Sequence, residues 1–208
     1  MPSHILYFAP GSCAFASLIA LAEAGLPFEA RKINLAEREQ DSAWFRVLNP
    51  LGRVPVLEVG DTVVTETIAI LSYAAHAGPD ARLLPLGDPL ALAKAYEFMA
   101  WLASNVHVTI AQLWRTERFV DEPAAAAAVK AAAPERLERA FRSIEQRLAG
   151  PWALGPGFSV VDGYLAVFFR WAQRLEMDMS AFPRWSGHQA ALLARPSAMS
   201  ALAIEQAG

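Results

Sequence analysis

The chain changes its hydrophobic periodicity at one proline-rich segment, and this change limits the folds open to it. Before that segment, short runs rich in β-branched and aromatic residues alternate with helical patterns, whereas after it every apolar pattern has helical spacing. The segment itself, residues 79–89, carries three prolines and one glycine, a composition typical of a connector. The sequence therefore predicts an α/β domain over residues 1–80, a linker over 81–89 and an all-helical domain over 90–208.

The first domain is expected to have the element order βαβαββα, which gives a four-stranded mixed sheet with helices on its faces. The expected elements are strands over 4–9 and 28–35, a hairpin over 54–66 that turns at Gly60-Asp61, and helices over 13–26, 41–48 and 65–78. Gly25 and Gly78 are expected to end the first and last of these helices.

The second domain is expected to contain only helices. Apolar residues recur at helical spacing over 90–118, 124–149, 160–175 and 184–205. Alanine dominates residues 124–133 and favours a helix, which we expect to be interrupted near Pro134. Ser159 and Asp162 have the spacing of a capping box at the start of the third helical segment.

Composition excludes several classes of function. The net charge is −3 and no run of Lys or Arg is present, so a nucleic-acid partner is not expected. The most apolar stretch, YLAVFF, is far shorter than the roughly 20 residues that span a bilayer, so no membrane segment is expected. A single cysteine excludes an internal disulfide and a cysteine-based zinc cluster. Together with a start that does not resemble a secretory signal, this predicts a cytoplasmic protein without a metal.

The stretch LYFAPGSCAF places three candidate chemical groups where the first strand ends and the first helix begins. Cys13 lies close to the unpaired amides of that helix, an environment that lowers a thiol pKa and would also stabilise a bound thiolate. Ser12 could equally be a helix N-cap, and Tyr7 could be an ordinary strand residue. Each of the three has a structural explanation as well as a chemical one.

A second candidate binding region spans NPLGRVPVL and TETIAI. Pro55 cannot donate to a β-ladder, and a cis Val54–Pro55 bond would leave the Val54 backbone free to pair with an extended peptide. TET opens a helix at residues 65–67, where Thr65 or Glu66 could cap it or where the free amides could receive a carboxylate. This second region therefore suits a peptide ligand with a charged end.

In this order and spacing, YFAPGSC, NPLGRVPVL and TETIAI resemble the glutathione-binding domain of cytosolic glutathione transferases. FSVVDGYLAVFFRWA and ARPSAM extend the resemblance into the C-terminal half, so that it covers essentially the whole chain. The resemblance implies a thioredoxin-like first domain in which Val54 and cis-Pro55 hold the cysteinyl backbone of glutathione, with Arg53 beside them. It also implies that Glu66 and Thr67 bind the γ-glutamyl end.

The resemblance leaves the thiol-activating residue open. The bacterial beta class has a cysteine at the position of Cys13 and a histidine in the fourth helix, where this chain has His107. The delta and theta-like enzymes use a serine that matches Ser12, and the alpha, mu and pi classes use a tyrosine near the position of Tyr7. This chain departs from the beta class in having Ala100 and Asn105 where that class tends to carry an asparagine and an acid.

The implied activity is transfer of the glutathione thiolate to a small hydrophobic electrophile by a homodimeric enzyme. Candidates for lining the electrophile site in the second domain are His107, Trp114, Phe119, Phe168 and Trp171. Two alternatives remain: a glutathione-dependent thiol-disulfide oxidoreductase that uses Cys13, and a non-catalytic protein that binds glutathione or another ligand.

Overall fold

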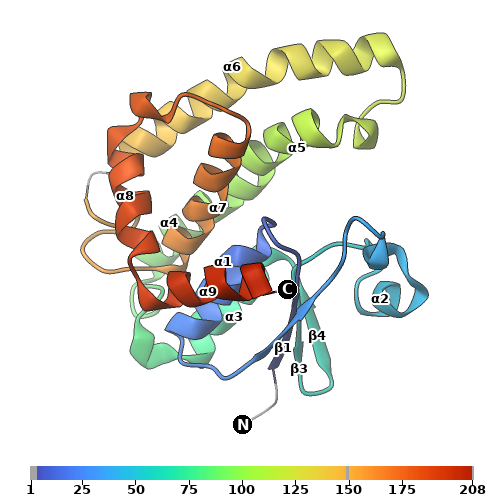
Figure 1. The fold of residues 1–208 in the computed structure, drawn as a ribbon. Coiled ribbons are helices and arrows are strands. Elements are labelled where there is room, and N and C mark those ends of the chain that lie inside the picture. Colours follow the sequence, from blue (N-terminus) through green and yellow to red (C-terminus); the bar gives the residue numbers. More distant parts are fainter. Residues whose placement is uncertain (1–3, 149, 208) are drawn as a thin grey trace.

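The computed structural model describes residues 4–148 and 150–207. Its strands are β1 (His4–Phe8), β2 (Glu29–Lys32), β3 (Val56–Val59) and β4 (Thr62–Thr65). Its α-helices are α1 (Ala14–Glu23), α2 (Ala43–Leu48), α3 (Thr67–Ala77), α4 (Pro89–Trp101), α5 (Val108–Trp114), α6 (Pro123–Arg147), α7 (Val160–Arg174), α8 (Pro183–Leu193) and α9 (Pro196–Ala207). The helical half lies over one side of the sheet (Figure 1).

The four strands form one mixed sheet, as the sequence predicts, and their order is β2-β1-β3-β4. β1 pairs in parallel with β2 and antiparallel with β3, while β3 and β4 form the expected hairpin around Gly60-Asp61. Gly60 has a φ of 58°, which suits a tight hairpin turn because glycine adopts positive φ without strain. With α1 between them, β1 and β2 form the parallel βαβ unit that a thioredoxin-like domain requires.

The two faces of the sheet are covered by different helices. Leu6 and Phe8 of β1 pack into the large core that includes α1 and α3. The intervening Tyr7 packs on the opposite face with Phe45 of α2, because successive strand side chains alternate between faces. The position of a residue along β1 therefore decides which side of the sheet its chemistry can reach.

The sheet half and the helical half share one hydrophobic core. α1 packs against α3 on one side and against α7 and α9 on the other (Figure 1). Phe15 and Ile19 of α1 are fully buried in the same cluster as Val161 and Leu165 of α7. This continuous core fixes the start of α1 relative to the helices of the second half.

The expected interruption of a helix near Pro134 is wrong. α6 continues through Pro134 without a break, because buried residues on both sides of the proline, Ala133 and Leu137 among them, anchor the helix in the core. The stretch of helical periodicity over 184–205 contains two helices, and the second begins at Pro196, since proline fits the first turn of a helix but not its interior. Across the described parts of the chain, no helix is long and apolar enough to cross a membrane.

The start of α7 is organised by Asp162, which is completely buried. One carboxylate oxygen accepts the Ser159 amide and hydroxyl, each at 2.7 Å, which confirms the predicted capping box. The other oxygen accepts the Ala153 amide at 2.7 Å and lies 2.8 Å from Nε2 of His188 on α8. One side chain thus joins a helix start, the preceding loop and a neighbouring helix.

We expect Asp162→Ala to lower the free energy of unfolding by about 3 kcal/mol, because it leaves buried donors on Ser159 and Ala153 without an acceptor. Urea denaturation measures this loss. The control is Asp178→Ala, which removes a capping carboxylate from an exposed turn and should cost about 1 kcal/mol or less. Equal losses in the two variants would contradict the role given to Asp162.

Candidate functional site

The loop after β1 brings Ser12 and Cys13 to the start of α1. Gly11 has a φ of 71°, a left-handed conformation that glycine adopts without strain, at the turn between strand and helix. The buried Cys13 thiol donates to the Val54 carbonyl oxygen at an Sγ–O distance of 3.7 Å. The Ser12 hydroxyl accepts the Ala14 N–H at 3.2 Å, which leaves its own proton available to another acceptor. Two of the three candidate thiol-activating groups therefore lie side by side.

The environment of Cys13 favours the neutral thiol. Burial raises the pKa of the Cys13 thiol, and the nearby Glu66 carboxylate raises it as well. A hydrogen bond from the Thr67 side chain and one from the backbone lower the pKa but do not offset burial. The sequence predicts that the helix start lowers this pKa, but desolvation outweighs the amides. Cys13 is a hydrogen-bond donor near neutral pH.

The loop before β3 presents backbone groups next to Cys13. The Val54–Pro55 peptide bond is cis. The sequence analysis overlooked Asn49, whose buried side chain donates to the Arg53 carbonyl oxygen at 2.8 Å and accepts the Leu51 amide at 3.1 Å. In the sequence, this loop-stabilising side chain is visible only as an asparagine that precedes a proline. Asn49 holds the loop that carries Arg53 and Val54.

Glu66 and Thr67 lie at the start of α3, beside the same thiol. Glu66 has a φ of 70°, an uncommon conformation for a residue other than glycine and one that often occurs at functional sites. The Glu66 side chain is exposed and does not cap α3, so the helix start keeps its amides for another acceptor. Thr67 is buried against Cys13. A carboxylate and a helix N-terminus therefore lie together, a combination suited to an amino acid end.

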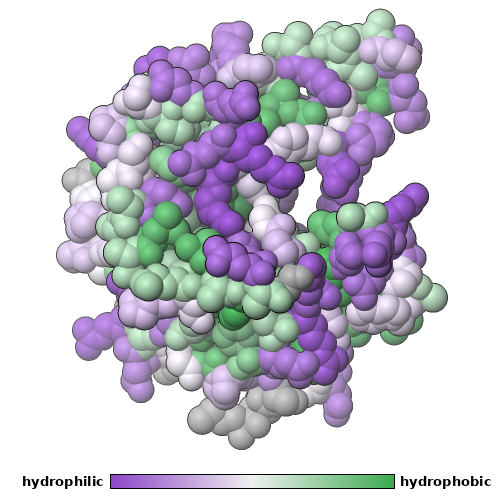
Figure 2. All heavy atoms as spheres, in the orientation of Figure 1, coloured by the Kyte–Doolittle hydropathy of each residue, from purple (hydrophilic) through white to green (hydrophobic). Residues whose placement is uncertain are grey.

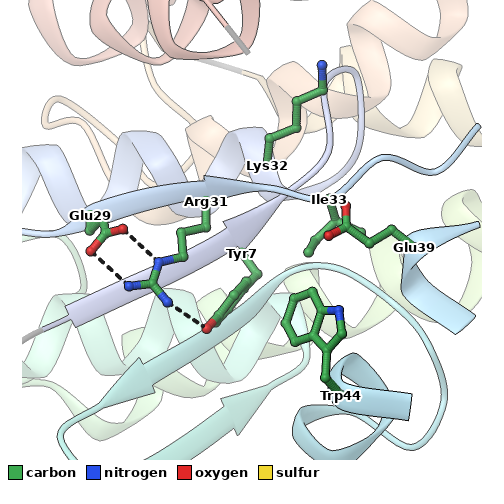
Figure 3. Close-up of a pocket in the computed structure, with 7 residues that line it drawn as sticks. All are labelled: Tyr7, Glu29, Arg31, Lys32, Ile33, Glu39 and Trp44. Atoms are coloured by element: carbon green, nitrogen blue, oxygen red, sulfur yellow. Dashed lines mark hydrogen bonds and ion pairs between the residues drawn. The ribbon is translucent and has the colours of Figure 1, made fainter. Parts of the chain in front are cut away.

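The structure separates Tyr7 from this group. The Tyr7 hydroxyl donates to Glu58 at 2.7 Å and accepts from Arg31 at 3.3 Å, on the sheet face opposite to Cys13. Figure 3 shows its ring beside Trp44, lining a surface cavity of about 490 Å³ together with charged side chains of β2. The alternation along β1 thus corrects the prediction that Tyr7 could activate a thiol. Its pKa is raised, chiefly by burial and the Glu58 hydrogen bond.

The helical half holds Gly11 from two directions, which the sequence analysis did not foresee. The Gly11 amide donates to Glu205 of α9 at 2.9 Å, and the Gly11 carbonyl oxygen accepts from the Trp171 indole of α7 at 2.8 Å. Glu205 is nearly buried and forms a 2.6 Å ion pair with Arg170, whose guanidinium lies 4.1 Å from the centre of the Phe15 ring. The loop that carries Ser12 and Cys13 therefore depends on both halves of the chain.

His107 lies in the helical half, where the charge of Arg53 from the sheet half acts on it. It ends a π-helical turn, Leu102–His107, an irregularity that is frequent at functional sites. Its ring packs edge-on against Trp171, with 4.9 Å between the ring centres. Burial, together with the positive charges of Arg53 and Arg118, lowers the pKa of His107 to about 4. The imidazole is therefore neutral at physiological pH.

The other aromatic candidates divide between cleft and core. Trp114 packs against Trp171 at 5.6 Å between ring centres, and Phe119 is 45% exposed. Phe168 is fully buried against Tyr164, which makes it a core residue rather than a ligand contact. Tyr164, which the sequence analysis passed over, is buried close to Cys13 and Glu66, and burial followed by these two groups raises its pKa. Its place in an apolar run gave no sign of this contact.

Two family models match the chain. Residues 2–76 match the model described as glutathione S-transferase, N-terminal domain, and residues 127–190 match the one described as glutathione S-transferase, C-terminal domain. Among curated proteins, glutathione S-transferase GstA of Escherichia coli O157:H7 is 28% identical over 96% of this chain and 98% of its own length. The match thus extends over nearly the full length of both proteins.

Solved structures give the same result. A glutathione transferase homologue from Sulfitobacter, solved with bound glutathione, is 35% identical with a TM-score of 0.91 over 96% of this chain and 97% of its own. A bacterial beta class glutathione S-transferase from Sphingomonas chungbukensis is 32% identical with a TM-score of 0.85 over 97% of this chain and 98% of its own. With a thioredoxin-like domain followed by a helical domain, this chain belongs to the glutathione S-transferase family.

Proposed function

We propose that this family member binds reduced glutathione beside Cys13 and transfers its sulfur to an electrophile held by the helical half. The observation that carries the proposal is the position of the single thiol of the chain. Cys13 lies 3.7 Å from the Val54 carbonyl oxygen and next to Thr67, at the start of two helices. A tripeptide that uses the Val54 backbone and the start of α3 would bring its own thiol to Ser12 and Cys13.

The groups around Cys13 match the parts of glutathione. Glutathione has an extended backbone, a zwitterionic γ-glutamyl end and one thiol. The backbone of Val54 offers pairing groups to the peptide. Glu66 offers a carboxylate to the ammonium group, and the start of α3 with Thr67 offers donors to the α-carboxylate. Arg53 adds a cation for the carboxylate at the other end.

Transfer requires the bound thiol to ionise. The thiolate sulfur forms a bond to the electrophilic carbon, the leaving group departs with its electron pair, and the thiol proton passes to solvent. Lowering the glutathione thiol pKa by about two units requires about 2.7 kcal/mol of preferential thiolate stabilisation. Hydrogen bonds to a charged acceptor and a helix start together reach this value. Ser12 supplies one such bond, and Cys13, as a neutral donor, supplies a second when its proton turns from the Val54 carbonyl oxygen to the bound thiolate.

The state of Cys13 favours a transferase over the oxidoreductase alternative. An oxidoreductase would need the Cys13 thiolate as its nucleophile. Burial raises the pKa of Cys13 instead, and this raises the cost of that thiolate. Ala100 and Asn105, where this chain departs from the beta class, would favour the non-catalytic alternative if they disrupted the site. Asn105 is exposed and bonded to Ser104, outside the contacts that join His107 to Trp171.

The family resemblance also implies a homodimer, which we retain as a proposal together with a cytoplasmic location. Leu51 in the loop before β3 and Leu90 at the start of α4 are 61% and 71% exposed. Side chains of this size are available for burial against a second copy. The single thiol, Cys13, is free, which suits a reducing compartment.

We expect Cys13→Ala to raise the pKa of bound glutathione by about one unit, because it removes a donor to the thiolate. The variant has no thiol of its own, so the ultraviolet absorbance of thiolate against pH reports only the ligand. Ser12→Ala, measured in parallel, should produce a smaller increase. Calorimetry confirms that glutathione is bound in each sample. An unchanged pKa in Cys13→Ala would contradict the role of Cys13.

We expect Glu66→Gln to weaken glutathione binding about tenfold, because it removes the charge opposite the γ-glutamyl ammonium group. Isothermal titration calorimetry measures the dissociation constant. Glu37→Gln, an exposed change on the same domain, is the control and should leave it unchanged. A glutathione analogue without the α-amino group should bind wild type and Glu66→Gln equally. A tenfold loss with this analogue as well would assign the effect to structure rather than to the ammonium contact.

Sedimentation velocity should give a species of twice the mass of one chain, because exposed Leu51 and Leu90 gain burial in a dimer. Dilution series extend the measurement to low concentration. A monomer at every concentration would contradict the proposed homodimer and leave the glutathione site of the single chain unaffected.

A further inference from the structure

Four exposed arginines from both halves of the chain lie near one another, near His107 or near Gly11. Arg53 comes from the loop before β3, and Arg115 and Arg118 follow α5. The charge of Arg118 interacts with those of Arg53 and Arg115, and Arg53 and Arg118 both act on His107. Arg174 of α7 lies beside Gly11. Figure 2 shows a notch on this side of the molecule, between the α5–α6 end of the helical half and α2, with hydrophilic residues along its margins.

The fourth arginine, Arg174, lies against the aromatic ring of Trp114. The Arg174 guanidinium lies 5.3 Å from the centre of the Trp114 ring, and its Nη1 atom would be 3.6 Å from a methyl group added to Gly11. Trp114 in turn packs on Trp171, which packs on His107. Aromatic rings and guanidinium groups are therefore interleaved along one side of the thiol loop.

Among the described residues, these four arginines are not held in ion pairs. Across residues 4–148 and 150–207, no carboxylate forms an ion pair with any of the four arginines. The nearest acids that act on Arg118 are Glu117 and Asp41, and Asp41 is already paired with Arg46 at 2.6 Å and with Arg38 at 2.9 Å. Lost hydration, followed by the charges of Arg53 and Arg115, lowers the pKa of Arg118, and the charges of Glu117 and Asp41 oppose this only in part.

The neutral His107 adds no charge to this group of arginines, and the group differs in sign from the chain as a whole. The chain carries a net charge of −3, so a group of unpaired arginines in one cleft runs against its overall balance. One bound carboxylate on glutathione, which Arg53 can pair, accounts for a single cation. Arg115, Arg118 and Arg174 remain, and Arg174 lies against Trp114 on the aromatic side of the thiol loop. A positive field of this kind concentrates anions.

We propose that the electrophile used by this protein is an anionic aromatic compound, with a ring that packs on Trp114 and a carboxylate that pairs with Arg118 and Arg115. This inference rests on the proposed transferase function and replaces its general hydrophobic electrophile with a charged one. The aromatic wall supplies the apolar contact, and the arginines supply selectivity and attraction from solution. A neutral ring of the same shape would gain only the first of these.

The test compares two electrophiles that differ only in charge. A chlorodinitrobenzoate and the matching chlorodinitrobenzamide undergo the same reaction, in which the glutathione sulfur displaces chloride from the ring. Each kcat/KM is divided by the uncatalysed rate constant with glutathione, so that intrinsic reactivity cancels. We expect the corrected ratio to favour the benzoate in wild type and to fall as ionic strength rises, since salt screens the arginines.

Arg118→Gln and Arg115→Gln should each lower this benzoate preference by about threefold, the effect of one partly exposed ion pair. Arg136→Gln is the matched control: Arg136 is exposed on α6, outside the cleft, and its loss should leave the ratio unchanged. The glutathione KM is measured for every variant. A fall in the ratio for the two cleft variants alone, with a stable glutathione KM, supports the inference.

Three results would overturn it. The first is a wild-type ratio near one, and the second is an equal fall of the ratio in Arg136→Gln. The third is a rise in the glutathione KM of Arg118→Gln with an unchanged ratio, which would assign the arginine to glutathione itself. Turnover of the benzamide distinguishes failure of the anionic substrate class from failure of the transferase function. When the benzamide reacts without a benzoate preference, the transferase function stands and the anionic substrate class fails; when neither compound reacts, both fail.

Discussion

Burial of α1 on all sides is the constraint on which the rest of this structure depends. Every residue from 14 to 21 is buried, and the alanines among them allow the sheet, α3, α7 and α9 to approach the same helix. A helix that is apolar all round has to lie inside a protein. Because α1 is shared by the two halves, its first residues are positioned by both, and those residues carry the thiol loop.

The site follows from that position. Gly11 is bonded through its amide to α9 and through its carbonyl group to α7, so Ser12 and Cys13 are presented on a loop whose backbone has little freedom. The same burial that holds the loop raises the pKa of Cys13. Packing thereby disfavours the Cys13 thiolate, which agrees with the role that we propose for Cys13 as a donor to a bound thiolate.

Much of the fold could be predicted because periodicity and turn chemistry are local. The hairpin at Gly60-Asp61 and the capping box at Ser159 each needed only a few neighbouring residues. The errors arose where distant packing overrides local preference. Pro134 was expected to interrupt α6, but core contacts on both sides of it keep the helix continuous. Tyr7 was grouped with Cys13 by closeness in sequence, although a strand sends adjacent side chains to opposite faces.

By itself, the sequence determined the element types, the family resemblance and the residue types in the two candidate glutathione-binding regions, because these depend on patterns within short stretches. Only the tertiary structure decided which groups meet. It places Cys13 in contact with Val54 and Thr67, and it places Tyr7 on the other face of the sheet. Glu205 and Trp171 form hydrogen bonds to Gly11, and arginines from both halves act on His107. The physical reason is that contacts, hydration and electric fields depend on distances in space between residues far apart in the chain.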